Sequence, residues 1–385
     1  MERKKYFKKI KKAVIKIGTS SLSDINGSLD SAKIKRFTDQ VSKIVIKDID
    51  AIIVTSGAIA AGLGVLGLDK KPSDISKLQA AASVGQVELM RVYRDLFYAV
   101  NINVGQILLT REDMVRRLQY LNIKNTIDRL LDFHIVPIIN ENDSVAVEEI
   151  KFGDNDRLAA MVAVLTEADI LIILSDIDGL YDGNPQISSD AKLITFVDKI
   201  TPEIEKLAGS SGSKYSLGGM ASKIKAAQIC SFSGIPMVVA NSTGSGILED
   251  IIGFKTAGTF FAPQISGKVK SLKKWIAFGV KTKGSIYLDS GAVEAVKNKG
   301  RSILPVGILK VEGRFEKGES LRVCDPEGNI LGKGISNFSN EEITGIIGKN
   351  GRQIKDLFGK GLCTEVIHRD NLVVFKENGF EEERE

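Results

Sequence analysis

Short apolar segments rich in valine and isoleucine recur along the chain up to Ala240, and longer stretches with helical spacing separate them. The apolar segments are nearly continuous, which is typical of strands buried on both faces of a parallel sheet. Strands that alternate with helices predict an α/β domain in which helices sandwich a mostly parallel sheet. The predicted strands are Ala13–Ile17, Ala51–Val54, Val104–Leu108, Ile135–Ile139, Asp169–Leu174 and Met237–Ala240, and the predicted helices are Ser31–Ile46, Ile75–Val100, Leu121–Phe133, Asp156–Ala168 and Ala221–Ser233.

The pattern changes after Gly258. The stretch to about Lys274 has no strong periodicity, and we interpret it as a connection. Beyond it, short strands separated by turn signals predict a small β-rich, barrel-like domain. These strands are Gly284–Leu288, Val306–Val311, Ser320–Cys324, Ile330–Gly334 and Leu372–Phe375. We therefore expect an α/β domain over residues 1–260, a linker over 261–274, a β-rich domain over 275–375 and an acidic tail over 376–385.

Composition places the 385-residue chain among soluble globular proteins, with 43% hydrophobic and 26% charged residues. No run approaches the ~18 uninterrupted apolar residues of a membrane span, and no apolar core follows the N-terminal lysines as in a secretory signal. Three widely spaced cysteines, an odd number, argue against a disulfide framework and fit a reducing cytoplasm.

The net charge of +5 is unevenly distributed. Residues 268–375 carry 19 basic and 12 acidic side chains, a net +7, whereas residues 13–267 carry a net −5. A basic C-terminal region beside an acidic main body suggests different partners for the two parts. Ordinary scatter of solvated charges is the alternative explanation.

Ligands of open parallel sheets bind beyond the carboxyl ends of the strands, so the residues that follow each strand are the first candidates. The first strand runs into Lys16–Ser20, a lysine followed by glycine and hydroxyl residues, which suits a polyphosphate. The second ends in Thr55–Ala58, where small side chains let a ligand approach the backbone. An exposed lysine and an ordinary tight turn are the structural alternatives.

Two clusters of amides and carboxylates, Asn140–Asp143 and Gly153–Asp156, follow the fourth strand. Such side chains suit an ammonium group, a carboxylate, or the organisation of lysines and Mg²⁺. The fifth strand ends in Ser175–Asp182, and Leu217–Lys223 opens a later helix with two glycines and a lysine. Free N–H groups at a helix start favour an anion, and Lys223 would reach a transferred phosphoryl group.

Three further patterns lack their required context. Gly62-x-Gly64-x-x-Gly67 does not directly follow a strand, as a dinucleotide fingerprint would. His368-Arg369-Asp370 has no Asp-Phe-Gly after it, as a protein kinase would have. Ile346–Gly351 has the letters of an RNA-binding Gly-x-x-Gly clamp, but its surroundings predict strands and not that domain's helices.

In order and spacing, these pieces resemble the glutamate 5-kinase family of the amino-acid kinase superfamily over about residues 12–372. The C-terminal part resembles the PUA domain that this family appends. The motifs that carry the resemblance are Val14–Thr19, Val54–Gly62, Ile139–Asp143, Gly153–Asp156, Asp176–Tyr181 and Gly218–Lys223, with Ser302–Ile308 and Val366–Asp370 in the PUA part.

The resemblance implies a role for each matching residue. Lys16, Lys223 and Asp156 would be the catalytic residues. The two lysines would contact the ATP phosphates and stabilise the transferring phosphoryl group, and Asp156 would hold both lysines in place. The glutamate-binding residues would be Ser56, Asn140, Asp143 and Asn155. The nucleotide site would be lined by Lys16, Ser175, Asp176, Leu217, Gly218, Gly219, Met220, Ala221, Ser222 and Lys223.

The resemblance also implies ATP with Mg²⁺, a homo-oligomer, and γ-glutamyl phosphate as a product that enters proline synthesis. Alternatives are a related kinase acting on aspartate, N-acetylglutamate, carbamate or a nucleotide, and an RNA-binding role for the basic PUA part. The chain departs from the family pattern at Leu217 and Ser222, where threonines are usual, and at Asn337-Phe338, where a tyrosine is expected.

Overall fold

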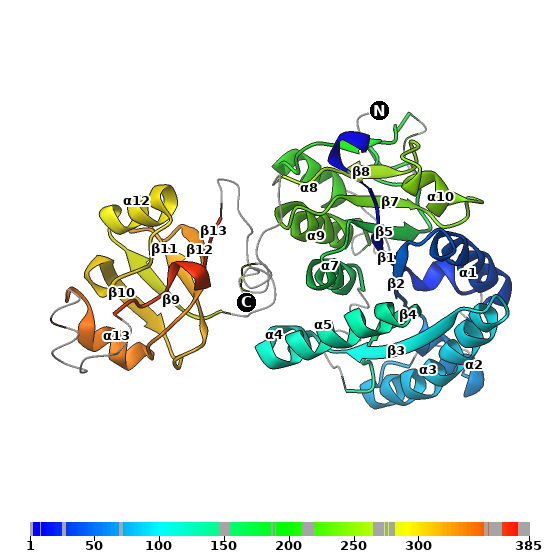
Figure 1. The fold of residues 1–385 in the computed structure, drawn as a ribbon, viewed down its shortest axis with the longest axis horizontal. Coiled ribbons are helices and arrows are strands. Elements are labelled where there is room, and N and C mark those ends of the chain that lie inside the picture. Colours follow the sequence, from blue (N-terminus) through cyan, green and yellow to red (C-terminus); the bar gives the residue numbers. More distant parts are fainter. Residues whose placement is uncertain are drawn as a thin grey trace. The chain divides into compact units, whose positions relative to one another are not determined.

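A computed structural model describes residues 3–7, 9–24, 28–68, 72–145, 155–185, 188, 190–209, 219–264, 273, 276, 282–349, 353 and 364–375. The chain divides into two compact units, Met1–Lys268 and Val269–Glu385 (Figure 1). Each unit has its own sheet and its own hydrophobic core. No helix in the described part of the chain is long and apolar enough to span a bilayer.

The sheet of the first unit has eight strands among the described residues, in the order β3-β4-β2-β1-β5-β7-β8-β6. Neighbours from β3 to β7 are parallel, and β8 is antiparallel to β7. The predicted mostly parallel sheet is confirmed. The strands are β1 (Lys12–Ile17), β2 (Asp50–Val54), β3 (Asn103–Leu109), β4 (Ile135–Glu141), β5 (Ile170–Ser175), β6 (Phe196–Val197), β7 (Met237–Asn241) and β8 (Thr259–Phe261).

Helices cover both faces of this sheet, with α1, α3 and α10 on one face and α5, α7 and α9 on the other (Figure 1). The helices of the first unit are α1 (Ser31–Val45), α2 (Ala58–Val65), α3 (Ile75–Tyr98), α4 (Arg111–Val115), α5 (Arg117–Asp132), α7 (Asn155–Thr166), α8 (Pro202–Gly209), α9 (Gly219–Phe232) and α10 (Ile247–Ile252).

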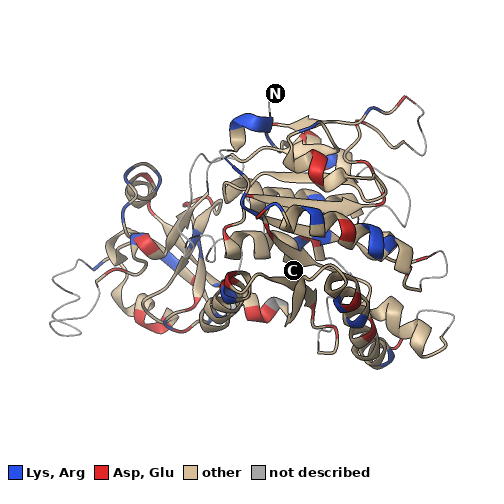
Figure 2. Cartoon of the chain, turned by 45° about the vertical axis from the view of Figure 1, so that its right-hand side comes forward, with Lys and Arg blue, Asp and Glu red and all other residues tan. Residues whose placement is uncertain are grey.

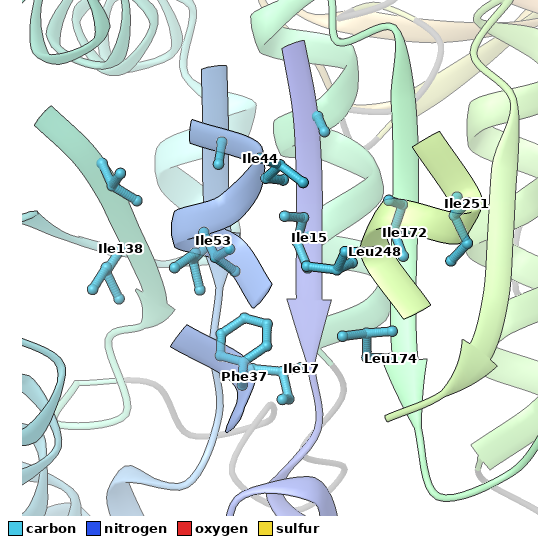
Figure 3. Close-up of a cluster of buried hydrophobic side chains, with 14 of the residues drawn as sticks. Ile15, Ile17, Phe37, Ile44, Ile53, Ile138, Ile172, Leu174, Leu248 and Ile251 are labelled. Carbon is cyan, nitrogen blue, oxygen red and sulfur yellow. The ribbon is translucent and has the colours of Figure 1, made fainter. Parts of the chain in front are cut away.

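Alternation along β1 decides where its lysine points. Ile15 and Ile17 pack in the core beneath α1 and α10, against side chains such as Phe37 and Leu248 (Figure 3). Successive side chains of a strand point to opposite faces, so Lys16 faces the side that α7 covers. Charged residues otherwise lie mainly on helices and connecting segments (Figure 2). A buried lysine in the central strand is therefore an exception that needs a partner.

Two glycines let α2 and α3 meet backbone to backbone. A Cβ atom at Gly85 would lie 1.8 Å from the carbonyl oxygen of Ala58, and one at Gly62 would lie 1.8 Å from that of Ala81. Gly57, which precedes α2, has a φ of +101°, a conformation that side chains rarely allow. This close contact holds the middle of α3 beside the turn that follows β2.

Among its described residues the second unit has a five-stranded sheet in the order β10-β9-β11-β12-β13, and its β-rich character is confirmed. Two short helices, α12 and α13, were not predicted. α12 starts at an Asp289 cap, and α13 starts at a capping box between Ser339 and Glu342, a recognisable sequence signal. The elements are β9 (Thr282–Leu288), α12 (Ser290–Lys299), β10 (Ile308–Gly313), β11 (Ser320–Cys324), β12 (Ile330–Ile335), α13 (Asn340–Ile346) and β13 (Leu372–Val374).

We predicted that the connection between the two domains starts directly after Gly258, and this predicted start is wrong. Residues Thr259–Phe261 form β8, which pairs with β7. Gly258 has a φ of +60°, and a Cβ atom there would lie 2.0 Å from the carbonyl oxygen of Val239. A three-residue strand has too few positions to show a periodicity, so its partner strand, and not its own pattern, defines it.

Candidate active site

Two lysines from distant parts of the sequence meet on one carboxylate. Nζ of Lys16, at the end of β1, lies 2.5 Å from Oδ1 of Asp156, and Nζ of Lys223, in α9, lies 3.1 Å from Oδ2. The lysines are 7% and 6% exposed, and Asp156 is 1% exposed. The structure thus brings together the three residues for which the sequence predicted a catalytic role.

The charges of this cluster do not cancel. Burial opposes the ionisation of Asp156, but the ammonium group of Lys16 and then that of Lys223 outweigh it and lower the pKa of this carboxyl to about 2. One negative and two positive charges leave an excess positive charge in a place with little access to water. An anionic ligand is the natural complement of such a cluster.

The first turn of α9 is built around the same carboxylate. Oγ of Ser222 donates to Oδ2 of Asp156 over 2.9 Å, and Nζ of Lys223 also donates to the carbonyl oxygen of Gly219 over 3.1 Å. A Cβ atom at Gly219 would meet nothing within 4 Å, so space is open there. Met220 and Ala221 lie half-buried in this turn, whereas Leu217 and Gly218 lie outside the described residues.

Beside the charged cluster lies a row of buried amides. Nδ2 of Asn155, the residue before Asp156, shares its two hydrogens among three acceptors: the carbonyl oxygen of Thr55 (2.6 Å), Oγ of Ser56 (3.1 Å) and Oδ1 of Asn140 (2.9 Å). The ends of β2 and β4 and the start of α7 are joined by these bonds. Three of the four predicted glutamate-binding residues therefore lie in contact, and Asp143 lies half-buried in the turn after β4.

A second polar group lies at the carboxyl ends of β5 and β7. Oγ of Ser175, at the end of β5, donates to Oδ1 of Asp176 over 3.0 Å. Nearby, Asp178 accepts from Nδ2 of Asn241 (2.8 Å) and from the hydroxyl of Tyr181 (2.9 Å). This group and the amide row lie on opposite sides of β1, because the strand order is β4-β2-β1-β5-β7 in this region.

Comparison with known proteins shows which family the chain belongs to. Residues 11–241 match the model of the amino acid kinase family, and residues 284–358 match that of the PUA domain. The chain belongs to the amino acid kinase family. The second unit contains its PUA domain.

Curated relatives indicate which members of the amino acid kinase family the chain is similar to. The chain is 41% identical to glutamate 5-kinase of Syntrophotalea carbinolica over 97% of this chain and 100% of that protein. It is 44% identical to glutamate 5-kinase of Caldanaerobacter subterraneus subsp. tengcongensis over 94% of this chain and 97% of that protein. The crystal structure of UMP kinase from Ureaplasma parvum covers 66% of this chain and 100% of its own, at 18% identity and a TM-score of 0.45, so the assignment rests on the sequence relatives.

Sequence reasoning missed two residues of α3 that support the amide row. The hydroxyl of Tyr93 lies 2.9 Å from Oγ1 of Thr55, and Oε1 of Gln86 accepts from Nδ2 of Asn140 over 2.8 Å. Burial raises the pKa of Tyr93, which keeps its hydroxyl neutral. Gln86 stands in the helical stripe of Ala82, Leu89 and Tyr93, and a glutamine on an apolar face was the signal that could have found it.

We predict a pH-dependent stability difference between the wild type and Asp156→Asn. The pKa of Asp156 is lowered in the folded chain, so its contribution to stability is present above the unfolded-state pKa near 4 and is lost as the pH falls towards about 2. We expect Asp156→Asn to lower the free energy of unfolding by on the order of 2 kcal/mol at about pH 7, and by much less at about pH 2.5.

Urea unfolding across this pH range measures the difference. The control is Asp39→Asn, which removes an exposed pair with Lys35 on α1 and should change little at any pH. A difference for Asp156→Asn that stays constant with pH would contradict the ion-pair explanation.

Proposed function

We propose that this chain transfers the γ-phosphoryl group of ATP to the γ-carboxylate of L-glutamate. The product would be L-glutamyl 5-phosphate, in the first step of proline biosynthesis. The observation that carries the proposal is the buried cluster of Lys16, Asp156 and Lys223, which has an excess positive charge and lies beside a row of amides. Relatives that match nearly the whole chain are named glutamate 5-kinase, which supports glutamate as the acceptor.

The reaction suits a site without a general base. A glutamate carboxyl has a reference pKa of about 4.3 and is ionised at neutral pH, so no proton has to be removed. A carboxylate oxygen forms a bond to the γ-phosphorus, the bond from that phosphorus to the bridging oxygen breaks, and ADP leaves with the electron pair. The obstacle is repulsion between two anions, which positioned cations reduce.

Each predicted residue has a place in this scheme. Lys16 and Lys223 would stabilise the transferring phosphoryl group, and Asp156 would hold both lysines in place. Ser56, Asn140, Asp143 and Asn155 would bind glutamate. Ser175 and Asp176, with residues 217–223 at the start of α9, would line the nucleotide site.

Mg²⁺ fits this site as a companion of ATP. No group of three or more His, Cys, Asp or Glu side chains in the described ranges could hold a metal ion. Asp156 is already engaged by two ammonium groups. A magnesium ion typically keeps phosphate oxygens and waters among its ligands, and it would supply further charge neutralisation on the phosphates.

We predict that the purified chain forms γ-glutamyl hydroxamate from L-glutamate, ATP, Mg²⁺ and hydroxylamine. Hydroxylamine traps acyl phosphates, so the product reports transfer to a carboxylate. Aspartate, N-acetylglutamate and UMP serve as competing acceptors, with ADP release as the second readout. Use of these acceptors as readily as glutamate would refute the proposed substrate.

We predict that Lys223→Ala lowers kcat by roughly 10²-fold or more, with a much smaller effect on the KM for glutamate. A cation that acts on charge developing in the transition state affects kcat most.

Asp143→Ala should mainly raise the glutamate KM, because we assign it to the part of glutamate that does not react. Lys225→Ala, an exposed lysine of the same helix as Lys223, is the matched control. The reverse division in steady-state kinetics would contradict these roles.

We further propose that catalysis resides in residues 1–260, with a linker over 261–274, the PUA domain over 275–375 and an acidic tail over 376–385. The net +7 of residues 268–375 motivates an RNA-binding role for the PUA part.

We predict that a chain ending at Gly267 keeps kcat within about tenfold of the full-length value, a difference of ~1.4 kcal/mol, and loses any salt-sensitive RNA binding. A truncated chain that melts cooperatively but is inactive would show that the second unit is needed for catalysis.

A further inference from the structure

Gln86 extends the row of amides by one residue on the side away from the lysines. This residue is 8% exposed, and its Oε1 accepts a hydrogen bond from Nδ2 of Asn140. Asn140 in turn bonds to Asn155, which precedes Asp156. The row therefore runs from the charged cluster through Asn155 and Asn140 to Gln86.

Backbone groups fix the orientation of Asn155 and Asn140, and Asn140 in turn fixes that of Gln86. The carbonyl oxygen of Thr55 can only accept, so the nitrogen of Asn155 must face it, and the same nitrogen faces Asn140. The backbone N–H of Glu141 can only donate, and it also faces Oδ1 of Asn140, over 2.9 Å. The nitrogen of Asn140 must then point to Gln86, which has to present its oxygen.

This orientation leaves the nitrogen of Gln86 at the open end of the row. Nε2 of Gln86 is buried, and it has no hydrogen-bond partner among the described residues. A buried donor without a partner is unfavourable, so native proteins nearly always satisfy it with a protein group, a water or a ligand. Two donor hydrogens at this place suit an oxygen with negative charge.

We propose that Nε2 of Gln86 binds the α-carboxylate of the glutamate substrate. The γ-carboxylate has to lie by Lys16 and Lys223 to react, and Gln86 is at the other end of the row. The group that reaches Gln86 is therefore the end of glutamate that does not react, and its oxygen-bearing part is the α-carboxylate. This inference rests on the proposed function for the identity of the substrate.

The substitution Gln86→Glu isolates the donor. The new carboxylate keeps an oxygen for Nδ2 of Asn140 and replaces the Nε2 donor by a second acceptor of nearly the same shape. We expect the KM for L-glutamate to rise about tenfold or more, with kcat within about threefold and the KM for ATP unchanged. Gln40→Glu, a buried glutamine of α1 that bonds to the backbone, is the matched control for burying a carboxylate.

A substrate analogue separates recognition from structural support. 4-Aminobutanoate keeps the ammonium group and the reacting carboxylate of glutamate but lacks the α-carboxylate. We expect its inhibition constant against glutamate to be unchanged or lower in Gln86→Glu, while the KM for glutamate rises. If the constants for both compounds rise together, or if kcat falls with an unchanged glutamate KM, Gln86 does not bind the α-carboxylate.

The outcomes also separate this inference from the proposed function. A wild-type chain that forms no hydroxamate from glutamate refutes the function itself. An active wild type whose Gln86→Glu variant melts normally and keeps its glutamate KM refutes only the role of Gln86. If Gln86→Glu does not fold, Gln86→Met serves instead, because it removes the donor without adding a charge. The ratio of the glutamate KM to the inhibition constant of 4-aminobutanoate is then compared between Gln86→Met and the wild type. An unchanged ratio overturns the inference.

Discussion

The whole site depends on one buried carboxylate that is shared by two ammonium groups. Removing three charges from water costs several kcal/mol for each ion, and the attraction within the cluster offsets this cost only partly, because Lys16, Asp156 and Lys223 together carry one excess positive charge. Packing alone would favour apolar side chains at Lys16, Asp156 and Lys223. The proposed function accounts for them, because the phosphate groups of ATP would bring the negative charge that the cluster lacks.

The parallel sheet is what makes such a cluster possible. β1, α7 and α9 contribute one charged residue each, and these residues are up to about two hundred positions apart in the sequence. Alternation along β1 turns Lys16 towards α7, and the first turn of α7 places Asp156 where a helix N-terminus favours a carboxylate. The same turn carries Asn155, so one short segment connects the charged cluster with the amide row.

The sequence was most informative where a residue's position follows from its own segment. Buried parallel strands are continuous in apolar residues, so β1, β2, β4, β5 and β7 were located within two residues, and the polar residues at their ends followed. Neither Gln86 nor Tyr93 could be assigned in this way, because each belongs to the site through contacts with β4 or β2 that only the packed α2–α3 pair creates. β8 was missed since a three-residue strand is defined by its neighbour.

Different interactions hold the amide row and the charged cluster, and this difference bears on the proposed catalysis. The amide row is oriented by backbone groups at Thr55 and Glu141, so its orientation is set without a ligand. The charged cluster is incomplete until an anion neutralises it. Asn155 and Asp156 are adjacent in the first turn of α7, so under the proposed function a glutamate bound by the amide row would lie at a fixed offset from both lysines. In that scheme the neutral amide row would position the substrate, and the charged cluster would stabilise the charge that develops as the phosphoryl group moves.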